Sequence, residues 1–411
     1  MKQPNSSSCR SCGASGLTSI IDLGQTPLAN GLLTREQLTQ PEPTYPLELV
    51  FCDKCTLVQI TETVPPEELF SEYFYRSSYS DTMLAHVQTL AGKLIRERKL
   101  GPDSLVMEVA SNDGYLLQYY QRAGVPVLGI EPAKNIARIA EQERGIPTLS
   151  EFFGADLAKR LRAKGKRADV VHAHNVLAHV PDLNGFALGL GLLLSEDGVA
   201  VIEVPYVKDM IDRTEFDTIY HEHLCYFSLT ALDGLFRRHG LTIVNVERLD
   251  IHGGALRVEV AKENSERQAS VDRLLREESN WGVGDLGFYS GFGAKIETLR
   301  RELTGLLRRL RAENKSIAAY GASAKGSTLL NCFGIRQETL DFVVDRSVIK
   351  QGHYTPGTHL PIHAPEKLLE AMPDYTLLLT WNFTDEVLEQ QAEYRRCGGR
   401  FIIPVPEVKI V

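Results

Sequence analysis

The chain has 411 residues, which is long for one hydrophobic core, and typical domain sizes predict two to four domains. Its content of 43% hydrophobic and 24% charged residues is that of an ordinary globular protein, so the composition excludes a disordered or fibrous chain. The formal net charge of −8 would repel a polyanion, and we therefore expect no nucleic acid partner.

The chain begins with a polar stretch that lacks the apolar core of a signal peptide. It also contains no run of about 18 apolar residues, the length that a membrane-spanning helix needs. We therefore expect a cytoplasmic protein with no membrane partner.

Four of the seven cysteines form two Cys-x-x-Cys pairs near the N-terminus: Cys9, Cys12, Cys52 and Cys55. In a reducing cytosol this doubled spacing favours a metal site over disulfides, and four thiolates suit tetrahedral zinc. A redox pair is the alternative. Because protein ligands fill all four positions, the predicted zinc is structural. We place a zinc-binding domain at residues 1–80, which would have too small a core to fold without such a link.

Strand-like and helix-like stretches alternate in the next part of the chain. The pattern predicts helices at 81–98, 115–122 and 135–144 and strands at 104–109, 126–130, 169–173 and 198–203. Such alternation is typical of a mostly parallel sheet with helices on both faces. We therefore predict a Rossmann-like α/β domain over residues 81–255.

The last third repeats this pattern. A long charged helical region at 264–314, interrupted by glycines at 282–293, precedes strands at 316–320, 342–344, 376–380 and 401–403. The loop Gly321–Gly326 follows the first of these strands and precedes a helix from residue 327, which is the arrangement of an anion site. The alternative is a purely structural loop. We predict a second Rossmann-like α/β domain over residues 256–411.

The loop from Glu108 to Gly114 ends a strand and opens a helix, as a cofactor-binding loop does. It departs from the dinucleotide fingerprint because Ala110 and Asn112 stand in place of glycines. Glu131, which ends the next strand, is placed to accept hydrogen bonds from two ribose hydroxyls. A dinucleotide would be bound in the same way, and a tight turn without a ligand is a further alternative. The Asn-Asp-Gly form of the loop and the segments at 151–153 and 174–175 favour S-adenosylmethionine.

A run of ionisable residues, Tyr220-His221-Glu222-His223, precedes an apolar stretch. We call it the central run. In a strand-like or irregular segment, Tyr220 and Glu222 would face one way and the two histidines the other. A metal-binding histidine pair and a histidine buried for structural reasons are alternatives. A histidine that titrates near neutrality beside a carboxylate can also exchange protons, and this predicts a wall of a catalytic pocket.

These motifs together resemble the S-adenosylmethionine-dependent nucleotide-sugar C-3 methyltransferases of antibiotic deoxysugar biosynthesis, such as the tetronitrose and mycarose enzymes. The resemblance covers essentially the whole chain. It rests on the paired Cys-x-x-Cys turns, Tyr73–Ser78, Asn112–Gly114, Asn175 and His179, Phe216-Asp-x-x-Tyr220-x-Glu222-His223, His252–Gly254 and Tyr320–Lys325. It implies a zinc-binding domain, a class I methyltransferase domain and a C-terminal Rossmann-like domain.

The resemblance implies methyl transfer to C-3 of a nucleotide-linked 4-keto-deoxysugar, with thymidine diphosphate as the expected carrier. His223 would remove the C-3 proton, and the enolate would attack the methyl group. Tyr220 or His179 would stabilise the enolate oxygen, and Glu222 would belong to the same cluster. The cofactor site would comprise Glu108, Ala110, Asn112, Gly114, Glu131, Pro132, Phe152 and Asn175.

The nucleoside diphosphate would lie over Gly321, Ser323 and Lys325. Tyr75, Tyr79, His252 and Gly253 are candidates for contacts with the sugar. Two other functions stay open: an O- or N-methyltransferase acting on a nucleotide sugar, and a zinc-organised binding module with an inactive methyltransferase fold.

Overall fold

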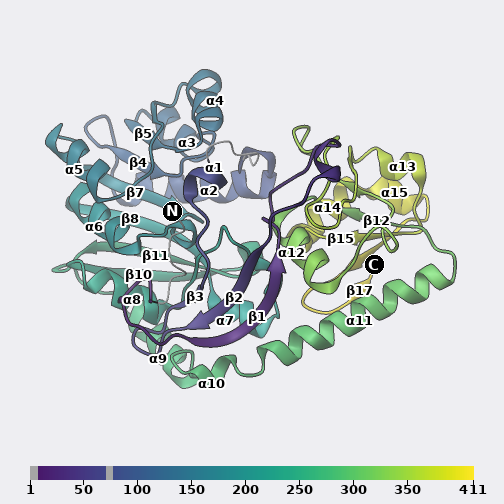
Figure 1. Ribbon diagram of the computed structural model, residues 1–411. Helices are drawn as coiled ribbons and strands as arrows, with labels where there is room; N and C mark the ends of the chain where they lie inside the picture. The colour runs from purple at the N-terminus through teal and green to yellow at the C-terminus, as the bar shows by residue number, and fades with distance from the viewer. Residues whose placement is uncertain (1–7, 71–76) are drawn as a thin grey trace.

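The chain forms three β-sheets within the part that the computed structural model describes, residues 8–70 and 77–411 without the side chains of Phe70 and His252. Figure 1 shows the three regions in order of colour, with the purple N-terminal strands between the teal middle domain and the yellow-green C-terminal domain. The candidate site depends on how these regions meet.

The N-terminal sheet is antiparallel and was not predicted from the sequence. Its strand order is β1 (Thr18–Thr26), β2 (Tyr45–Phe51), β3 (Val58–Ile60) and β9 (Cys225–Tyr226). The short helices η1 (Gln37–Thr39) and α1 (Pro66–Phe70) lie in its connections. Because β9 comes directly after the central run, this run is tied to the N-terminal sheet by the pairing of Val58 with Tyr226.

The middle sheet has seven strands, in the order β10 (Leu241–Leu249), β11 (Ala255–Lys262), β8 (Leu194–Pro205), β7 (Ala168–His174), β4 (Val106–Val109), β5 (Val127–Ile130) and β6 (Thr148–Leu149). Strands β4 to β8 are parallel, as predicted. Strand β11 pairs antiparallel with both β8 and β10, and neither β10 nor β11 was predicted. The predicted boundary after residue 255 falls at the start of β11, which belongs to this sheet.

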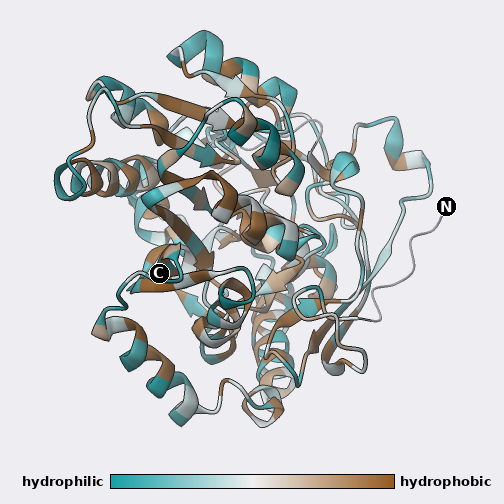
Figure 2. Cartoon of the chain, turned by 90° about the vertical axis from the view of Figure 1, so that its left-hand side faces the viewer, coloured by the Kyte–Doolittle hydropathy of each residue, from teal (hydrophilic) through white to brown (hydrophobic). Residues whose placement is uncertain are grey.

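Helices cover both faces of the middle sheet. They are α2 (Asp81–Glu97), α3 (Leu117–Arg122), α4 (Lys134–Arg144), α5 (Ala155–Ala163), α6 (Leu183–Leu193), α7 (Val207–Asp212) and α8 (Leu229–Arg237), with the short helices η2 (Ser77–Tyr79), η3 (Leu177–His179), η4 (Phe216–Thr218) and η5 (Ile251–Gly253). Alternate strand residues face opposite ways: Val106 and Val170 pack in the cluster of α2 and α3, whereas Met107 and Val171 pack in the cluster of α5 and α6. Figure 2 shows hydrophobic strands under helices whose outer faces are hydrophilic.

A buried polar row crosses the face of this sheet that carries α2 and α3. Tyr120 Oη lies 2.8 Å from His172 Nε2, and His172 Nδ1 lies 2.8 Å from His174 Nε2. His174 Nδ1 in turn lies 2.9 Å from Glu203 Oε2, and Arg257 Nε donates to Glu203 Oε1 at 2.7 Å. This row holds the carboxyl end of β7, where the candidate cofactor residue Asn175 follows.

The helices α9 (Ala269–Trp281), α10 (Leu286–Tyr289) and α11 (Phe292–Ala312) connect the middle sheet to a third sheet. Its order is β14 (Ile362–His363), β13 (Val343–Val344), β12 (Ile317–Tyr320), β15 (Tyr375–Leu378), β16 (Arg400–Ile403) and β17 (Lys409–Ile410), and only β17 pairs antiparallel. Its helices are α12 (Ala324–Phe333), α13 (Lys367–Ala371), η6 (Trp381–Phe383), α14 (Thr384–Gln390) and α15 (Ala392–Arg396). The predicted second Rossmann-like unit is therefore present.

None of the helices in the described ranges combines the length and the apolar composition that a membrane span requires.

Glu278 of α9 joins two parts of the middle domain. Its carboxylate is 1% exposed and accepts hydrogen bonds from Tyr206 Oη at 2.8 Å and from the backbone N–H groups of Leu229 and Thr230 at 2.7 and 2.8 Å. The two backbone donors belong to the first turn of α8, where a carboxylate also interacts favourably with the helix dipole.

We predict that Glu278→Ala lowers the free energy of unfolding by about 3 kcal/mol or more, because several buried donors lose their acceptor at once. Urea unfolding followed by fluorescence measures the effect. Glu277→Ala, one residue earlier on the same helix and not buried, is the matched control. Equal unfolding midpoints for the two variants would contradict this role of Glu278.

Candidate active site

The four predicted zinc ligands come together. The sulfur atoms of Cys9, Cys12, Cys52 and Cys55 all lie within 4.8 Å of one another. Cys9 and Cys12 lie at one tight turn, in which Gly13 N donates to Cys9 O, and Cys52 and Cys55 occupy the turn between β2 and β3, where Thr56 N donates to Cys52 O. Four thiolates converging from two turns match the ligand set of a closed structural zinc site.

The predicted cofactor loop between β4 and α3 has a strained backbone. Ala110 and Asn112 have φ values of 53° and 50°, so two non-glycine residues adopt the left-handed conformation that glycines usually occupy. Gly114 has φ 75°, and a Cβ there would lie 2.9 Å from Ile146 Cγ1. The loop thus keeps the conformation of a glycine-rich turn although two of its glycines are replaced.

Two buried carboxylates border this loop. Glu131 accepts hydrogen bonds from Asn112 N at its Oε2 and from Ala133 N at its Oε1, both at 2.9 Å, and burial raises its pKa to about 7 against the effect of these bonds. Glu108 is 1% exposed, and burial raises its pKa well above the ordinary value. Among the described residues, Glu108 Oε2 has no hydrogen-bond partner. A cationic donor placed there would satisfy this oxygen.

The remaining predicted cofactor residues lie at the same edge of the sheet. Pro132 directly follows Glu131, and Asn175, with φ 53°, follows β7 and donates its N–H to Glu203 O at 2.8 Å. Phe152 follows β6 and its side chain is 44% exposed. The carboxyl ends of β4, β5, β6 and β7 therefore carry every predicted cofactor residue, which is where ligands bind in parallel α/β sheets.

The central run forms a turn, so the expected alternation of its side chains is wrong. His223 N donates to Tyr220 O at 2.8 Å, and this turn brings the side chains of residues 220 and 223 together instead of separating them. His221 lies apart, with Nε2 3.1 Å from Pro46 O, and Glu222 Oε1 accepts from Asn30 Nδ2 at 2.7 Å. The turn, and not the alternation of side chains along a strand, therefore determines which residues of the central run lie together.

Hydrogen bonds fix the tautomer of His223. Its Nδ1 lies 2.9 Å from the carbonyl oxygen of Thr218, and a carbonyl only accepts, so Nδ1 carries the proton. Nε2 is then unprotonated in the neutral ring, and it lies 2.8 Å from Tyr220 Oη, which donates to it. His223 therefore presents an unprotonated ring nitrogen to the Tyr220 hydroxyl, and a neutral imidazole in this state can accept a proton.

His179 of η3 lies beside this pair, with its ring centroid 4.8 Å from that of His223. Desolvation lowers the pKa of His179 to about 4, so the ring is neutral at pH 7. A neutral ring can donate a hydrogen bond but carries no positive charge.

The predicted anion loop lies at the N-terminus of α12, which begins at residue 324 and not at 327 as expected. Ser323 caps the helix by accepting from Gly326 N at 3.0 Å, so Lys325 stands in the first helical turn. Lys325 Nζ lies 4.4 Å from the ring centroid of Trp381, whose Nε1 donates to Asp217 at 2.7 Å. Lys325 therefore lies where the C-terminal domain meets the middle domain.

Two carboxylates of the middle domain face this lysine. Burial raises the pKa of Glu215 to about 8 and that of Asp217 to about 6, and the charge of Lys325 opposes both shifts. The Glu215 carboxylate lies directly against Gly253, where a Cβ would be 2.5 Å from Oε2. Gly253 thus belongs to the same junction as Lys325.

The predicted sugar contacts are only partly described. Tyr75 lies outside the described residues, and so does the side chain of His252. Tyr79 of η2 is 39% exposed, and η2 lies beside the cofactor loop, since Ser77 N donates to Asn112 Oδ1 at 2.9 Å. Gly321 ends β12 beside the anion loop.

Asn30, Glu215 and Trp381 were not among the site residues predicted from the sequence. Asp217 belongs to one of the motifs above, but no role was predicted for it. Trp381 is one of only two tryptophans in the chain, which was an available signal. No signal in the sequence pointed to Asn30, because its partner Glu222 is 192 residues away.

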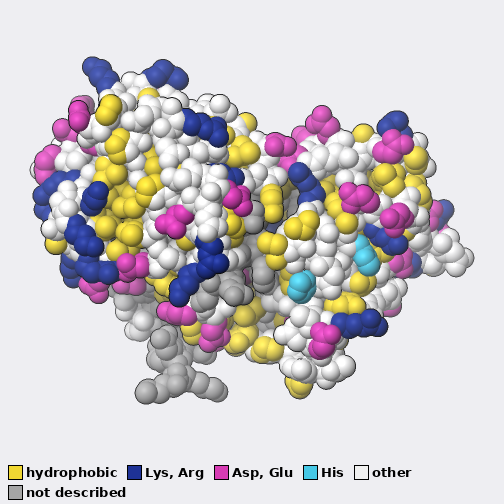
Figure 3. All heavy atoms as spheres, turned by 90° about the horizontal axis from the view of Figure 1, so that it is seen from above, with side chains coloured by type: hydrophobic (Ala, Val, Ile, Leu, Met, Phe, Trp, Pro, Cys, Tyr) yellow, Lys and Arg dark blue, Asp and Glu magenta, His cyan; other side chains and the backbone are white. Residues whose placement is uncertain are grey.

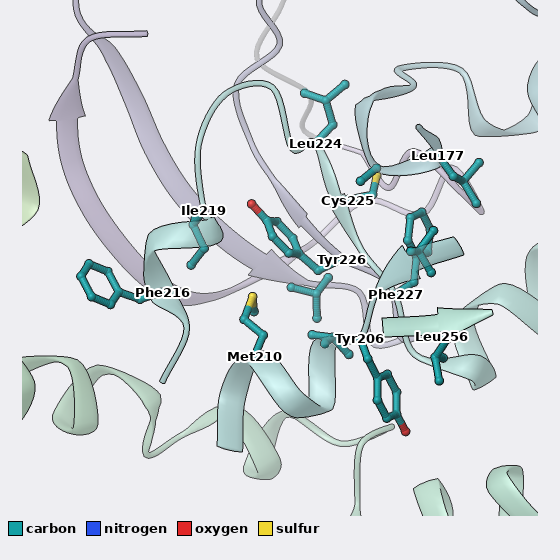
Figure 4. Packing of buried hydrophobic residues seen from close by; sticks show 14 of the residues in the cluster. Leu177, Tyr206, Met210, Phe216, Ile219, Leu224, Cys225, Tyr226, Phe227 and Leu256 are labelled. Carbon is teal, nitrogen blue, oxygen red and sulfur yellow. The ribbon is translucent and has the colours of Figure 1, made fainter. Parts of the chain in front are cut away.

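Residues 215–227, which we call the interdomain segment, are anchored by apolar side chains. Figure 4 shows Ile219, Leu224, Tyr226 and Phe227 packed between the N-terminal strands and the middle domain, and all four are buried. Seen from above, the surface divides into two lobes with a depression between them (Figure 3). Buried apolar side chains therefore anchor the interdomain segment.

Known protein families match consecutive stretches of the chain. Residues 9–70 match a family described as "Putative zinc binding domain", residues 75–246 a "Methyltransferase domain" and residues 250–406 a "C-methyltransferase C-terminal domain". These matches confirm the predicted fold class. With the four-cysteine cluster, they also confirm the predicted cofactors, zinc and S-adenosylmethionine.

The C-methyltransferase NovU of Streptomyces niveus is 35% identical to the chain over 405 residues, which cover 98% of this chain and 96% of NovU. The ubiquinone biosynthesis O-methyltransferase of Bartonella quintana (strain Toulouse) is 25% identical over 155 residues, 34% of this chain and 61% of that enzyme. The magnesium protoporphyrin IX methyltransferase of Synechocystis PCC 6803 aligns at 14% identity with a TM-score of 0.34, covering 44% of this chain and 79% of that structure. A likeness this low supports no conclusion about the site.

We predict that the purified protein contains one zinc ion per chain and that Cys52→Ser loses it, with a fall in Tm of roughly 5 °C or more, because metal binding stabilises the folded form of so small a domain. Elemental analysis and thermal unfolding measure the two effects. Cys397→Ser is the control, since Cys397 is exposed and far along the chain from the cluster. Equal zinc contents in the two variants would refute the assignment.

Proposed function

The chain belongs to the family of C-methyltransferases that includes NovU, and from this premise we propose that it methylates C-3 of a nucleotide-linked 4-keto-deoxysugar with S-adenosylmethionine as methyl donor. The expected carrier is thymidine diphosphate, and the expected pathway is the biosynthesis of branched deoxysugars. The observation that carries the proposal is the orientation of His223, whose unprotonated Nε2 faces Tyr220 in the interdomain segment.

Transfer to carbon requires a base, because the carbon must first lose a proton. A ketone at C-4 acidifies the neighbouring C–H bonds, and we assign the proton acceptor to His223 Nε2. The Thr218 carbonyl accepts from Nδ1 at 2.9 Å, and this bond favours the imidazolium that forms when Nε2 takes the proton. The electron pair of the C–H bond moves into the enolate. C-3 of the enolate would then bond to the methyl carbon while that carbon's bond to the donor sulfur breaks, so that S-adenosylhomocysteine leaves with the electron pair.

Tyr220 would change partners during this step. Its hydroxyl donates to His223 Nε2 at 2.8 Å, so a substrate carbon that reaches Nε2 displaces it. The displaced O–H is then available to the keto oxygen, where negative charge develops. His179, whose ring lies beside that of His223, is the alternative candidate for this donor. One displacement therefore exposes the base and releases the donor that stabilises the enolate.

S-adenosylmethionine supplies a methyl group activated by a sulfonium, and it also carries an α-ammonium group. The buried Glu108 oxygen without a partner fits this ammonium, which would satisfy the oxygen and ionise the carboxyl group. Glu131, Asn112 and Asn175 border the same edge of the sheet, and the exposed ring of Phe152 offers a stacking face for a base. No step of the reaction needs the zinc, whose four ligands leave no open position.

For the substrate, we propose that the diphosphate lies at the N-terminus of α12 near Ser323 and Lys325, where helix donors and an ammonium favour an anion. The sugar would then extend toward the central run, with Tyr75, Tyr79, His252 and Gly253 as candidate contacts. Thr328 of the same helix donates to Ile219 O at 3.2 Å, so α12 and the interdomain segment touch directly.

Glu108→Gln should weaken S-adenosylmethionine binding about tenfold or more, because it removes a charge-assisted hydrogen bond to the ammonium group. Isothermal titration calorimetry at pH 7.5 measures the dissociation constant. Glu141→Gln on the exposed side of α4 is the matched control. A constant that is unchanged in Glu108→Gln would remove Glu108 from the cofactor site, and no binding by the wild-type protein would favour an inactive fold.

The proposed reaction is tested without methyl donor. In deuterated water, the wild-type protein should exchange the C-3 hydrogen of thymidine diphosphate 4-keto-2,6-dideoxyglucose, as followed by proton NMR. We expect His223→Asn to slow this exchange by about 100-fold or more and Tyr220→Phe to slow it less, since the phenylalanine removes the donor but not the base. His221→Asn, which changes the histidine facing Pro46, should retain exchange.

The outcome of the exchange experiment distinguishes the candidate reactions. Exchange only at C-5, the other carbon next to the ketone, would move the methylation site to that carbon. The absence of any exchange, with methyl transfer to a hydroxyl or amine when donor is added, would identify an O- or N-methyltransferase. Unchanged exchange in His223→Asn would reject His223 as the base.

A further inference from the structure

The N-terminal domain reaches the central run. Asn30, in the connection between β1 and β2, donates from Nδ2 to Glu222 Oε1 at 2.7 Å. An amide nitrogen only donates, so the carboxylate oxygen must be the acceptor. A residue of the zinc-binding domain is thus in direct contact with a residue of the proposed catalytic cluster.

The connection that carries Asn30 is fixed to the C-terminal domain. We call residues 27–44 the strap. Leu33 and Tyr354 exchange backbone hydrogen bonds at 3.0 and 2.8 Å. Glu42 accepts from Gly357 N at 2.8 Å, and its carboxylate lies 3.1 Å from His359 Nε2. Two contacts that follow Asn30 in the chain, at Leu33 and Glu42, therefore hold the strap against the C-terminal domain. The position of the strap does not depend on the contact with Glu222 alone.

The opposite end of the N-terminal domain is fixed to the middle domain. Asn184 of α6 donates from Nδ2 to Arg10 O at 3.2 Å and to Ser11 O at 3.1 Å, beside the first pair of zinc ligands. Arg238, after α8, also donates to Ser11 O at 3.1 Å. The N-terminal domain thus bridges the other two domains, with Asn30 between its two attachments. In Figure 1 the purple strands lie between the teal middle domain and the yellow-green C-terminal domain.

We propose that Asn30 is a positioning residue for the methyl transfer: its amide holds the side chain of Glu222 in a fixed orientation, next in sequence to His223. The inference rests on the proposed function of the central run. It adds that the zinc-binding domain completes the active site through the strap, in addition to stabilising the fold.

The electrostatics of Glu222 support this role. The side chain is 4% exposed, and burial raises its pKa to about 7, while the bond from Asn30 and the charge of Lys350 both lower it. Lys350 belongs to the C-terminal domain and donates to Ala322 O at 2.8 Å. The other titratable groups around Glu222 are its neighbours in the central run and the neutral His179. Asn30 and Lys350, which both come from outside the middle domain, thus favour the ionised carboxylate.

The test measures the protonation of Glu222 directly, so that it does not depend on any substrate. Infrared difference spectra over pH 5 to 10 record protonated carboxyl groups, and Glu222→Gln assigns the band that belongs to Glu222. Asn30→Asp keeps the shape of asparagine but replaces its donor by a carboxyl group, whose charge adds to the expected rise, and Asn30→Ala removes the donor without adding a charge. Both variants should raise the midpoint of the Glu222 titration by about one pH unit or more, since a hydrogen bond to a charged group is lost.

Asn184→Ala is the matched control. It also removes an amide that joins the N-terminal and middle domains, but at the zinc end. In this variant the midpoint of the Glu222 titration should match that of the wild type, even if the Tm falls. If the exchange assay succeeds, its rate at pH 7 in Asn30→Ala should fall about fivefold and recover at higher pH, because a smaller fraction of Glu222 is ionised at pH 7.

A Glu222 midpoint that is the same in wild type, Asn30→Asp and Asn30→Ala would overturn the proposal. An equal shift in Asn184→Ala would also overturn it, because general loosening of the domain would then explain the change. Failure of the exchange assay with a shifted midpoint would reject the proposed reaction and leave the positioning of Glu222 by Asn30 intact.

Discussion

The burial of ionisable groups in the interdomain segment constrains the rest of the structure. A charged or polar group that leaves water costs several kcal/mol unless partners replace its hydration. These partners come from different domains: Asn30 of the N-terminal domain donates to Glu222, and Trp381 of the C-terminal domain donates to Asp217. The segment can therefore keep its polar groups buried only when all three domains are in place. Assembly of the domains and construction of the candidate site are the same physical process.

The zinc cluster contributes to this assembly from a distance. The turn that carries Cys52 and Cys55 joins β2 to β3, and β3 pairs with β9 directly after the central run. Four thiolates around one metal fix two turns of a domain whose own apolar core is small. The fixed sheet then holds the interdomain segment through backbone pairing and through Tyr226, which is 3% exposed. A structural metal thereby sets the geometry of residues that do not bind it.

The features that the sequence could predict are those determined locally. Apolar strands alternating with helices led to both α/β domains, and the strand ends at Glu108 and Glu131 led to the cofactor edge, because parallel strands end on one side of their sheet. The central run was misjudged because a turn hydrogen bond, and not strand periodicity, places Tyr220 against His223. Asn30 could not be found at all, since its contact with Glu222 depends on how three domains pack. Residues that complete a site from another domain leave no local pattern.

The charges at the junction of the middle and C-terminal domains bear on how an anion could be accepted there. Lys325 faces two carboxyl groups, and if both were ionised the junction would repel a phosphate. Burial raises the pKa of Glu215 to about 8, so this group is mostly protonated at pH 7, whereas Asp217, with a pKa of about 6, is mostly ionised. Asp217 also accepts a hydrogen bond from the N–H of Trp381, which partly compensates its negative charge. The lysine is therefore opposed by about one negative charge and not two. An anion brought to α12 would raise the pKa of both carboxyl groups further, so its arrival would be accompanied by proton uptake at Glu215 or Asp217, which would reduce the repulsion that it meets.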